Sequence, residues 1–258
     1  MVFNLEWPRL EIETNTTSEN LARMVSRIEA GFRRLGATEP HWSVLTHEKY
    51  TAANIEANKE EFYQFGAMGV EVVRKSLERV GYTMAGTAFE LGCGVGRSTI
   101  PLARHFTKVY GSDISATHLQ VASEAALSRG APNIEWLLVD RLSAFDAVPE
   151  FDFFFSVIVF QHNPPPVMTM MLRKLLSKLT PGGYAYFQIP TYIAGYRFES
   201  NEYLAHDAPE IQMHCIPQME VFRIVDLAGC RVLECREDTA AGDSNQILSN
   251  TFIVQRRD

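Results

Sequence analysis

Residues 89–97 read Phe-Glu-Leu-Gly-Cys-Gly-Val-Gly-Arg, and this short stretch decides the fold class. The apolar run 87–91 predicts a short strand, and residues 98–106 have the pattern of a helix. A glycine-rich turn between a strand and a helix lets backbone N–H groups approach a ligand closely. The stretch therefore indicates a nucleotide-binding α/β domain.

The spacing of the glycines separates two classes of cofactor. The dinucleotide fingerprint is G-x-G-x-x-G, which, counted from Gly92, requires a glycine at the position of Arg97. The third glycine is instead Gly96, and the acidic Glu90 precedes the first. A carboxylate there would repel a pyrophosphate but suits a ligand with an ammonium group. The loop therefore disfavours a nicotinamide-dependent dehydrogenase.

Strands and helices alternate after this loop. We expect strands at 87–91, 108–112, 134–139, 151–160 and 184–189, and helices at 98–106, 115–129 and 164–179. This alternation predicts a doubly wound parallel sheet. A helix at 217–227 is then followed by two strands, 231–237 and 249–255, with no helix between them, and these must pair antiparallel. The expected fold is α/β, with a mostly parallel sheet that ends in a C-terminal antiparallel hairpin.

Two segments lie outside this pattern. Residues 1–85 carry helical periodicity at 17–35 and 58–80, and we expect them to form an N-terminal helical extension that acts as a lid on a core spanning 86–258. Residues 191–216 are too long for a simple connection. They contain several aromatic side chains and follow the fifth strand, so we expect this insert to lie over the acceptor site.

Acidic residues end successive strands of the predicted sheet. Asp113 closes the second strand, at the distance from the glycine loop typical of a ribose-binding carboxylate. Asp140 closes the third strand, where an adenine amino group would lie. Parallel strands present their carboxyl ends at one edge, where such sheets bind ligands.

These motifs together resemble the class I S-adenosylmethionine-dependent methyltransferases. The resemblance runs from about residue 87 to 257 and rests on ELGCGVGR, GSDIS, LLVDR, FDFFFSVIVFQH and LTPGGYAYFQIP. It implies a seven-stranded sheet whose last strand is antiparallel, with S-adenosylmethionine as cofactor. The segments HWSVL at 41–45 and FYQFG at 62–66 resemble a bacterial subgroup of unassigned acceptor.

The resemblance also implies which residues bind the cofactor. Glu90, Gly92 and Gly94 would line its methionine end, with Cys93 and Gly96 completing the loop. Asp113 would bind the ribose, Ile114 would lie against the adenine, and Asp140 and Arg141 would meet the adenine edge. Arg97 has several possible roles: pairing with the cofactor carboxylate, with Glu90 or with Asp113, or lying on the surface.

Methyl transfer to a hydroxyl needs a base, whereas a bound neutral amine needs none. Gln161-His162-Asn163 directly follows the long fourth strand, so His162 is the expected catalytic base, with His206 and His214 as further candidates. His162 could equally hold its loop by hydrogen bonds. We expect a small-molecule acceptor, a sugar hydroxyl or another metabolite hydroxyl being the leading class. A protein acceptor and a non-catalytic cofactor-binding role remain alternatives.

Composition limits the partners. The chain has 24 Lys and Arg against 31 Asp and Glu, a formal net charge of -7, which disfavours nucleic acid as a partner. The four cysteines form no C-x-x-C pair or Cys/His cluster, so no metal site is expected. No apolar run is long enough to cross a bilayer, and the first residues lack a signal peptide's pattern. We therefore expect a soluble cytoplasmic enzyme without a membrane partner.

Overall fold

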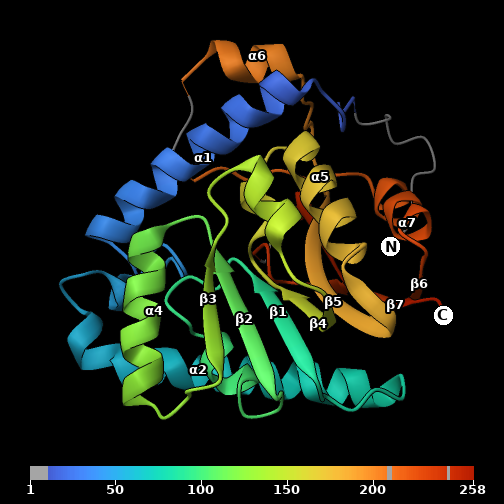
Figure 1. Cartoon of the computed structure of the whole chain (residues 1–258). Coiled ribbons are helices and arrows are strands. Elements are labelled where there is room, and N and C mark those ends of the chain that lie inside the picture. The colour runs from blue at the N-terminus through green and yellow to red at the C-terminus, as the bar shows by residue number, and fades with distance from the viewer. Residues whose placement is uncertain (1–10, 208–210, 243–244) are drawn as a thin grey trace.

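The computed structural model describes residues 11–207, 211–242 and 245–258, which form one seven-stranded sheet (Figure 1). The strand order is β3-β2-β1-β4-β5-β7-β6. The strands are β1 Thr87–Leu91, β2 Lys108–Asp113, β3 Ile134–Leu138, β4 Phe151–Ser156, β5 Leu179–Ile193, β6 Cys230–Asp238 and β7 Ile247–Arg256. Strands β1 to β5 pair parallel, and β7 is antiparallel to both β5 and β6. The predicted mostly parallel sheet with a C-terminal antiparallel hairpin is confirmed.

Helices cover both faces of this sheet. They are α1 Ser18–Thr38, α2 Ile55–Arg79, α3 Thr99–Leu102, α4 Ala116–Ser128, α5 Pro165–Leu176, α6 Ser200–Ala205 and α7 Gln218–Leu227, with short 3₁₀ turns η1 Glu48–Tyr50, η2 Leu142–Ala147 and η3 Phe160–His162. One apolar core joins α5, α7 and α1 to the sheet, and a second joins α2 and α3 to its other face. The apolar stripes seen in the sequence therefore bury against the strands.

The N-terminal helices occupy different places. Helix α2 lies along the sheet and buries Phe62, Val70 and Leu77 completely or nearly so. Helix α1 crosses the opposite end of the molecule beside α6, near the carboxyl ends of the strands (Figure 1). Both helices bury apolar residues in a core, but α1 does so beside the carboxyl edge of the sheet and α2 on the other face.

Several predicted boundaries were wrong, among them that of the fifth strand, which was expected at 184–189 and spans Leu179–Ile193. The fourth strand, expected at 151–160, ends at Ser156, because the chain turns at Ile158, whose φ is +62°. The helix expected at 98–106 is only α3, and the helix expected to reach residue 179 ends at Leu176. Leu179 already pairs with Phe151 in the sheet. Apolar residues line a turn or a strand as readily as a helix, so hydrophobicity alone did not place these ends.

Candidate active site

The carboxyl edge of the sheet holds a cavity with about 950 Å³ of atom-free space, counting solvent at its mouth. Its floor comes from the turns after β1, β2 and β4, since parallel strands end at the same edge. Residues 25, 28 and 32 of α1 and residues 43–44 form the opposite wall. The cavity therefore lies between the sheet and the N-terminal extension.

The glycine loop and the end of β2 are joined by one carboxylate. Asp113 Oδ2 accepts a 2.8 Å hydrogen bond from the backbone N–H of Gly94, and Oδ1 accepts a 2.9 Å bond from that of Ser115. Ser115 in turn caps α4 through its side chain. Gly92, Gly94 and Gly96 all have positive φ, which a side chain would strain. The loop is thus held in a shape that presents its backbone to the cavity.

Glu90 lies beneath this loop and is 4% exposed. Its Oε2 atom is buried and has no hydrogen-bond partner among the described residues. Burial raises the pKa of Glu90 to about 7, and Asp113 adds to that rise, while Arg97 opposes it. A buried carboxylate without a partner is costly unless a cation reaches it. Glu90 therefore fits the ammonium group expected from the sequence.

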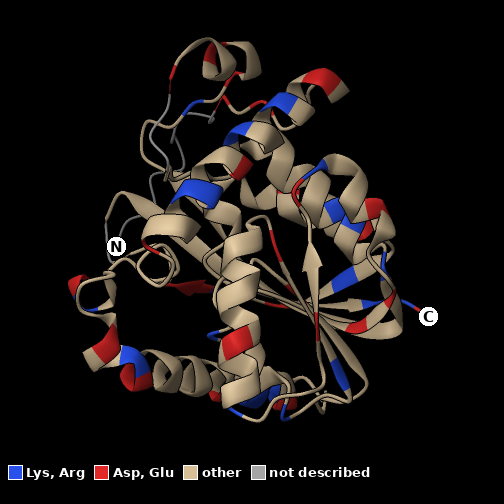
Figure 2. Ribbon diagram, turned by 60° about the vertical axis from the view of Figure 1, so that its left-hand side comes forward, with Lys and Arg blue, Asp and Glu red and all other residues tan. Residues whose placement is uncertain are grey.

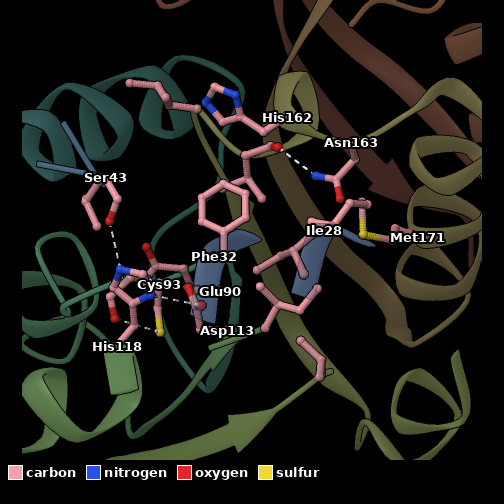
Figure 3. A pocket seen from close by; sticks show the side chains of 18 of the residues that line it. Ile28, Phe32, Ser43, Glu90, Cys93, Asp113, His118, His162, Asn163 and Met171 are labelled. Atoms are coloured by element: carbon pink, nitrogen blue, oxygen red, sulfur yellow. Dashed lines mark hydrogen bonds and ion pairs between the residues drawn. The ribbon is translucent and has the colours of Figure 1, made fainter. Parts of the chain in front are cut away.

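His118 is a site residue that the sequence reasoning missed. It is buried in the first turn of α4, and its Nε2 lies 2.8 Å from Ser43 Oγ in the N-terminal wall. Its Nδ1 has no hydrogen-bond partner among the described residues and lies 3.8 Å from Asp113 Oδ1 (Figure 3). Its place one turn after Asp113 was the signal available in the sequence.

His162 borders the cavity on the side of the turn after β4 (Figure 3). Its Nδ1 lies 2.9 Å from the backbone oxygen of Gln212. A carbonyl only accepts, so Nδ1 carries the proton and Nε2 keeps a lone pair. Burial lowers the pKa of His162 below its usual 6.5, which leaves the ring neutral at pH 7.

Two glutamines that the sequence did not single out fix this arrangement. The backbone N–H of Ile158 donates to Gln188 Oε1 at 2.9 Å, and Gln188 Nε2 donates to Gln161 Oε1 at 3.2 Å. The amide nitrogen of Gln161 therefore faces His162 Nε2, at a long 3.4 Å. The turn that ends β4 early thus places and orients the histidine.

Only some of the residues predicted to bind the cofactor line the cavity. Cys93 and Ile114 line it, together with Glu90, Gly92, Gly94, Asp113 and His162. Gly96, Asp140 and Arg141 do not line it; Asp140 and Arg141 pair with each other at 2.9 Å, and the Arg141 side chain is 70% exposed. Val139 and Phe145 lie in the lining near the end of β3 instead. The adenine role of Asp140 and Arg141 stays a prediction.

The other histidine candidates lie elsewhere. His206 is exposed at the end of α6. His214 is buried between Tyr196 Oη at 2.6 Å and Gln212 Oε1 at 3.1 Å, and burial lowers its pKa to about 4. No described residue of the insert 191–216 lines the cavity. The insert packs against α1, where Arg27 donates to the backbone oxygen of Tyr203, and it reaches the site only through Gln212 behind His162.

Residues 88–183 match the family described as "Methyltransferase domain". The ubiquinone biosynthesis O-methyltransferase of Serratia proteamaculans (strain 568) is 30% identical over 112 residues, which are 43% of this chain and 45% of that protein. The tRNA/tmRNA (uracil-C(5))-methyltransferase of a Nitratiruptor species is 33% identical over 66 residues, 26% of this chain and 18% of that protein. The matches thus span less than half the length of these relatives.

The fold is shared with solved methyltransferase structures. The magnesium protoporphyrin IX methyltransferase of Synechocystis PCC 6803, crystallised with bound S-adenosylmethionine, superposes with a TM-score of 0.61 at 17% identity, covering 89% of this chain and 97% of that one. The predicted resemblance is confirmed over the residues that the family model matches. Residues 88–183 match a methyltransferase domain, and the chain shares its fold with a methyltransferase crystallised with S-adenosylmethionine.

Proposed function

We propose that this protein transfers the methyl group of S-adenosylmethionine to a hydroxyl of a small molecule. The observation that carries the proposal is one cavity that holds both the glycine loop with Asp113 and the neutral His162. S-adenosylmethionine would supply the methyl group on a sulfonium that is already a good leaving group. The protein then has to align the acceptor, exclude water and remove a proton.

The residues present fit this cofactor. Glu90 Oε2 and His118 Nδ1 are buried polar atoms without partners among the described residues, and Asp113 keeps lone pairs beyond its two backbone bonds. Glu90 would hold the ammonium and Asp113 the ribose hydroxyls. Ile114, Val139 and Phe145 offer an apolar slot for the adenine.

His162 would act as the base for the acceptor hydroxyl. Its Nδ1 proton is held by Gln212, so a proton from the acceptor would go to Nε2. The long contact from Gln161 has to yield when Nε2 takes that proton. His206 lies away from the cavity, and both ring nitrogens of His214 are occupied.

A small acceptor suits the charge and shape of the molecule better than a nucleic acid. The net charge is -7, and Figure 2 shows Lys and Arg spread over several elements among Asp and Glu. The RNA-modifying relative matches over only 66 residues, which is too short a segment to support the same substrate for this chain. A protein acceptor and a cofactor-binding role without transfer are the remaining alternatives. No helix of the described residues is long and apolar enough to cross a membrane.

The test begins with calorimetry of S-adenosylmethionine and S-adenosylhomocysteine, for which we expect micromolar affinity that a chelator does not change. Methyl transfer is then followed by mass spectrometry over panels of metabolite hydroxyls, peptides and RNA. A methylated metabolite supports the proposal. Transfer only to peptide or RNA overturns the acceptor class, and binding without any transfer favours the non-catalytic alternative.

A further inference from the structure

Two groups of opposite charge, the buried Glu90 and the partly buried Arg97, line the cavity without pairing. Arg97 Nε is buried without a hydrogen-bond partner, and among the described residues no carboxylate comes within 4.0 Å of this guanidinium. The two charges still influence one another: Arg97 opposes the rise that burial causes in the pKa of Glu90, and Glu90 opposes the fall that burial causes in the pKa of Arg97. A charge separated from water and left unpaired is expensive, so each is suited to a ligand.

The surroundings of Arg97 hold its side chain at the cavity rather than at the surface. The guanidinium carbon lies 5.9 Å from the centre of the Phe62 ring, in a cation–π contact. Helix α2 packs directly on its backbone: a Cβ at Gly66 would come within 2.0 Å of the Arg97 oxygen and 2.8 Å of its Cγ. The ion pairs with Glu90 or Asp113 that the sequence left open do not occur among the described residues, and the Arg97 side chain lines the cavity.

We propose that Arg97 binds the α-carboxylate of the cofactor's methionine moiety while Glu90 binds the α-ammonium. This inference rests on the proposed function, because it assumes that the cofactor occupies this cavity. The two groups of an amino acid sit on one carbon atom. An unpaired cation and anion that line the same cavity and influence each other electrostatically are complementary to that zwitterion. Planar guanidinium and carboxylate groups form two parallel, charge-assisted bonds.

The proposal makes Arg97 selective for one end of the ligand. It should strengthen binding of S-adenosylhomocysteine, which carries the amino acid, and leave 5′-methylthioadenosine, which lacks it, unaffected. A purely structural arginine would affect both ligands alike, because both need the same loop and the same adenosine site. The pair of ligands therefore separates recognition from support of the fold.

The experiment is calorimetry of both ligands with the wild type, Arg97→Met, Arg97→Lys and the control Arg104→Met, whose arginine is exposed and outside the lining. Circular dichroism and melting temperature check that each variant is folded. We expect Arg97→Met to weaken the binding of S-adenosylhomocysteine about 10–100-fold and the binding of 5′-methylthioadenosine less than about twofold. Arg97→Lys should fall between, because a lysine keeps the charge without the planar fork.

Each other outcome overturns a different statement. Equal losses of affinity for both ligands would show that Arg97 has a structural role rather than a binding role. Failure of both Arg97→Met and Arg97→Lys to fold would show the same. Unchanged affinity of Arg97→Met for S-adenosylhomocysteine would show that the carboxylate binds elsewhere, with the proposed function intact. A wild type that binds neither ligand would overturn the proposed function and the role of Arg97 with it.

Discussion

The carboxylate of Asp113 at the end of β2 accepts a 2.8 Å hydrogen bond from the backbone N–H of Gly94 in the loop after β1. Its other oxygen accepts from the N–H of Ser115, so the group serves two backbone donors. Asp113→Ala should therefore lose stability as well as affinity. Two buried N–H groups left without partners would lower the free energy of unfolding by about 2–4 kcal/mol.

Chemical denaturation of Asp113→Ala checks this, with Asp140→Ala as the control. Among the described residues Asp140 pairs only with the exposed Arg141, and its loss should cost less than about 1 kcal/mol. Equal stability of Asp113→Ala and the wild type would mean that other groups hold the glycine loop.

Glu90 should make the ligand-free protein less stable at higher pH. Burial raises its pKa in the folded state to about 7, above the ordinary 4.5. Between pH 4.5 and 7 the folded protein thus holds a proton that the unfolded chain has released, and stability falls as pH rises. Glu90→Gln cannot ionise, so at pH 8 it should be more stable than the wild type by up to about 3 kcal/mol.

Urea titrations of wild type and Glu90→Gln at pH 5 and pH 8 measure this difference, which should shrink at the lower pH. The same variant should bind S-adenosylhomocysteine more weakly, because it has no charge for the ammonium. A stability difference that stays constant with pH would mean that Glu90 does not titrate in this range.

Gly66 should be intolerant of a side chain. A Cβ there would meet the backbone oxygen of Arg97 at 2.0 Å, and neither α2 nor the glycine loop can yield easily. Gly66→Ala should lower the free energy of unfolding by about 2–3 kcal/mol. The matched control is Gly69→Ala on the same helix, where nothing lies within 4 Å of the added methyl.

Gly69→Ala should instead stabilise by about 0.5–1 kcal/mol, because alanine favours the helix. Thermal melts of both variants measure these two opposite changes in stability. A stable Gly66→Ala would show that α2 is free to shift on the loop, contrary to the close packing described above.

If the acceptor is a hydroxyl, His162→Ala should lower kcat by about 10²–10⁴-fold with little change in cofactor affinity. Since burial lowers the pKa of His162, the wild type should keep its activity at pH 7 and lose it only below about pH 6.5, as the ring takes a proton. His206→Ala is the control, because that histidine is exposed and does not line the cavity.

Steady-state rates from pH 5 to 8 with an acceptor found by screening test this. Near-normal turnover of His162→Ala would leave two explanations: an amine acceptor, or catalysis by alignment of the substrates alone. An acidic limb that survives in His162→Ala would point to another base or to the acceptor itself.

We expect the N-terminal extension to act as a lid through residues 41–47 more than through α2. Ser43 bonds His118, and a Cβ at Gly94 would come within 2.3 Å of Val44 Cγ2, so this segment lies on the glycine loop. Hydrogen exchange in 41–47 should fall when S-adenosylhomocysteine binds, while the buried turns of α2 near Val70 and Leu77 stay unchanged. Equal exchange with and without ligand would make the segment a fixed part of the fold.

Local sequence was enough for much of the site. The loop from Glu90 to Gly96 and the carboxylate of Asp113 are adjacent to strands with clear patterns, so their place at the sheet edge followed from the parallel topology. His162 was reached by the same argument. His118 and Gln188 were missed, because their roles depend on Ser43 and Gln161, which contact them from distant parts of the chain.

The sequence by itself determined the α/β fold and the acidic residue before the glycine loop, since both depend on hydrophobic period and short-range spacing. The cofactor followed from the resemblance of its motifs to a known family. Only the tertiary structure decided that Arg97 Nε is buried without a hydrogen-bond partner, that Asp140 and Arg141 pair outside the cavity lining, and that Gln212 of the insert contacts His162. Pairing and burial depend on which distant segments meet, and a pattern of neighbouring residues does not contain that information.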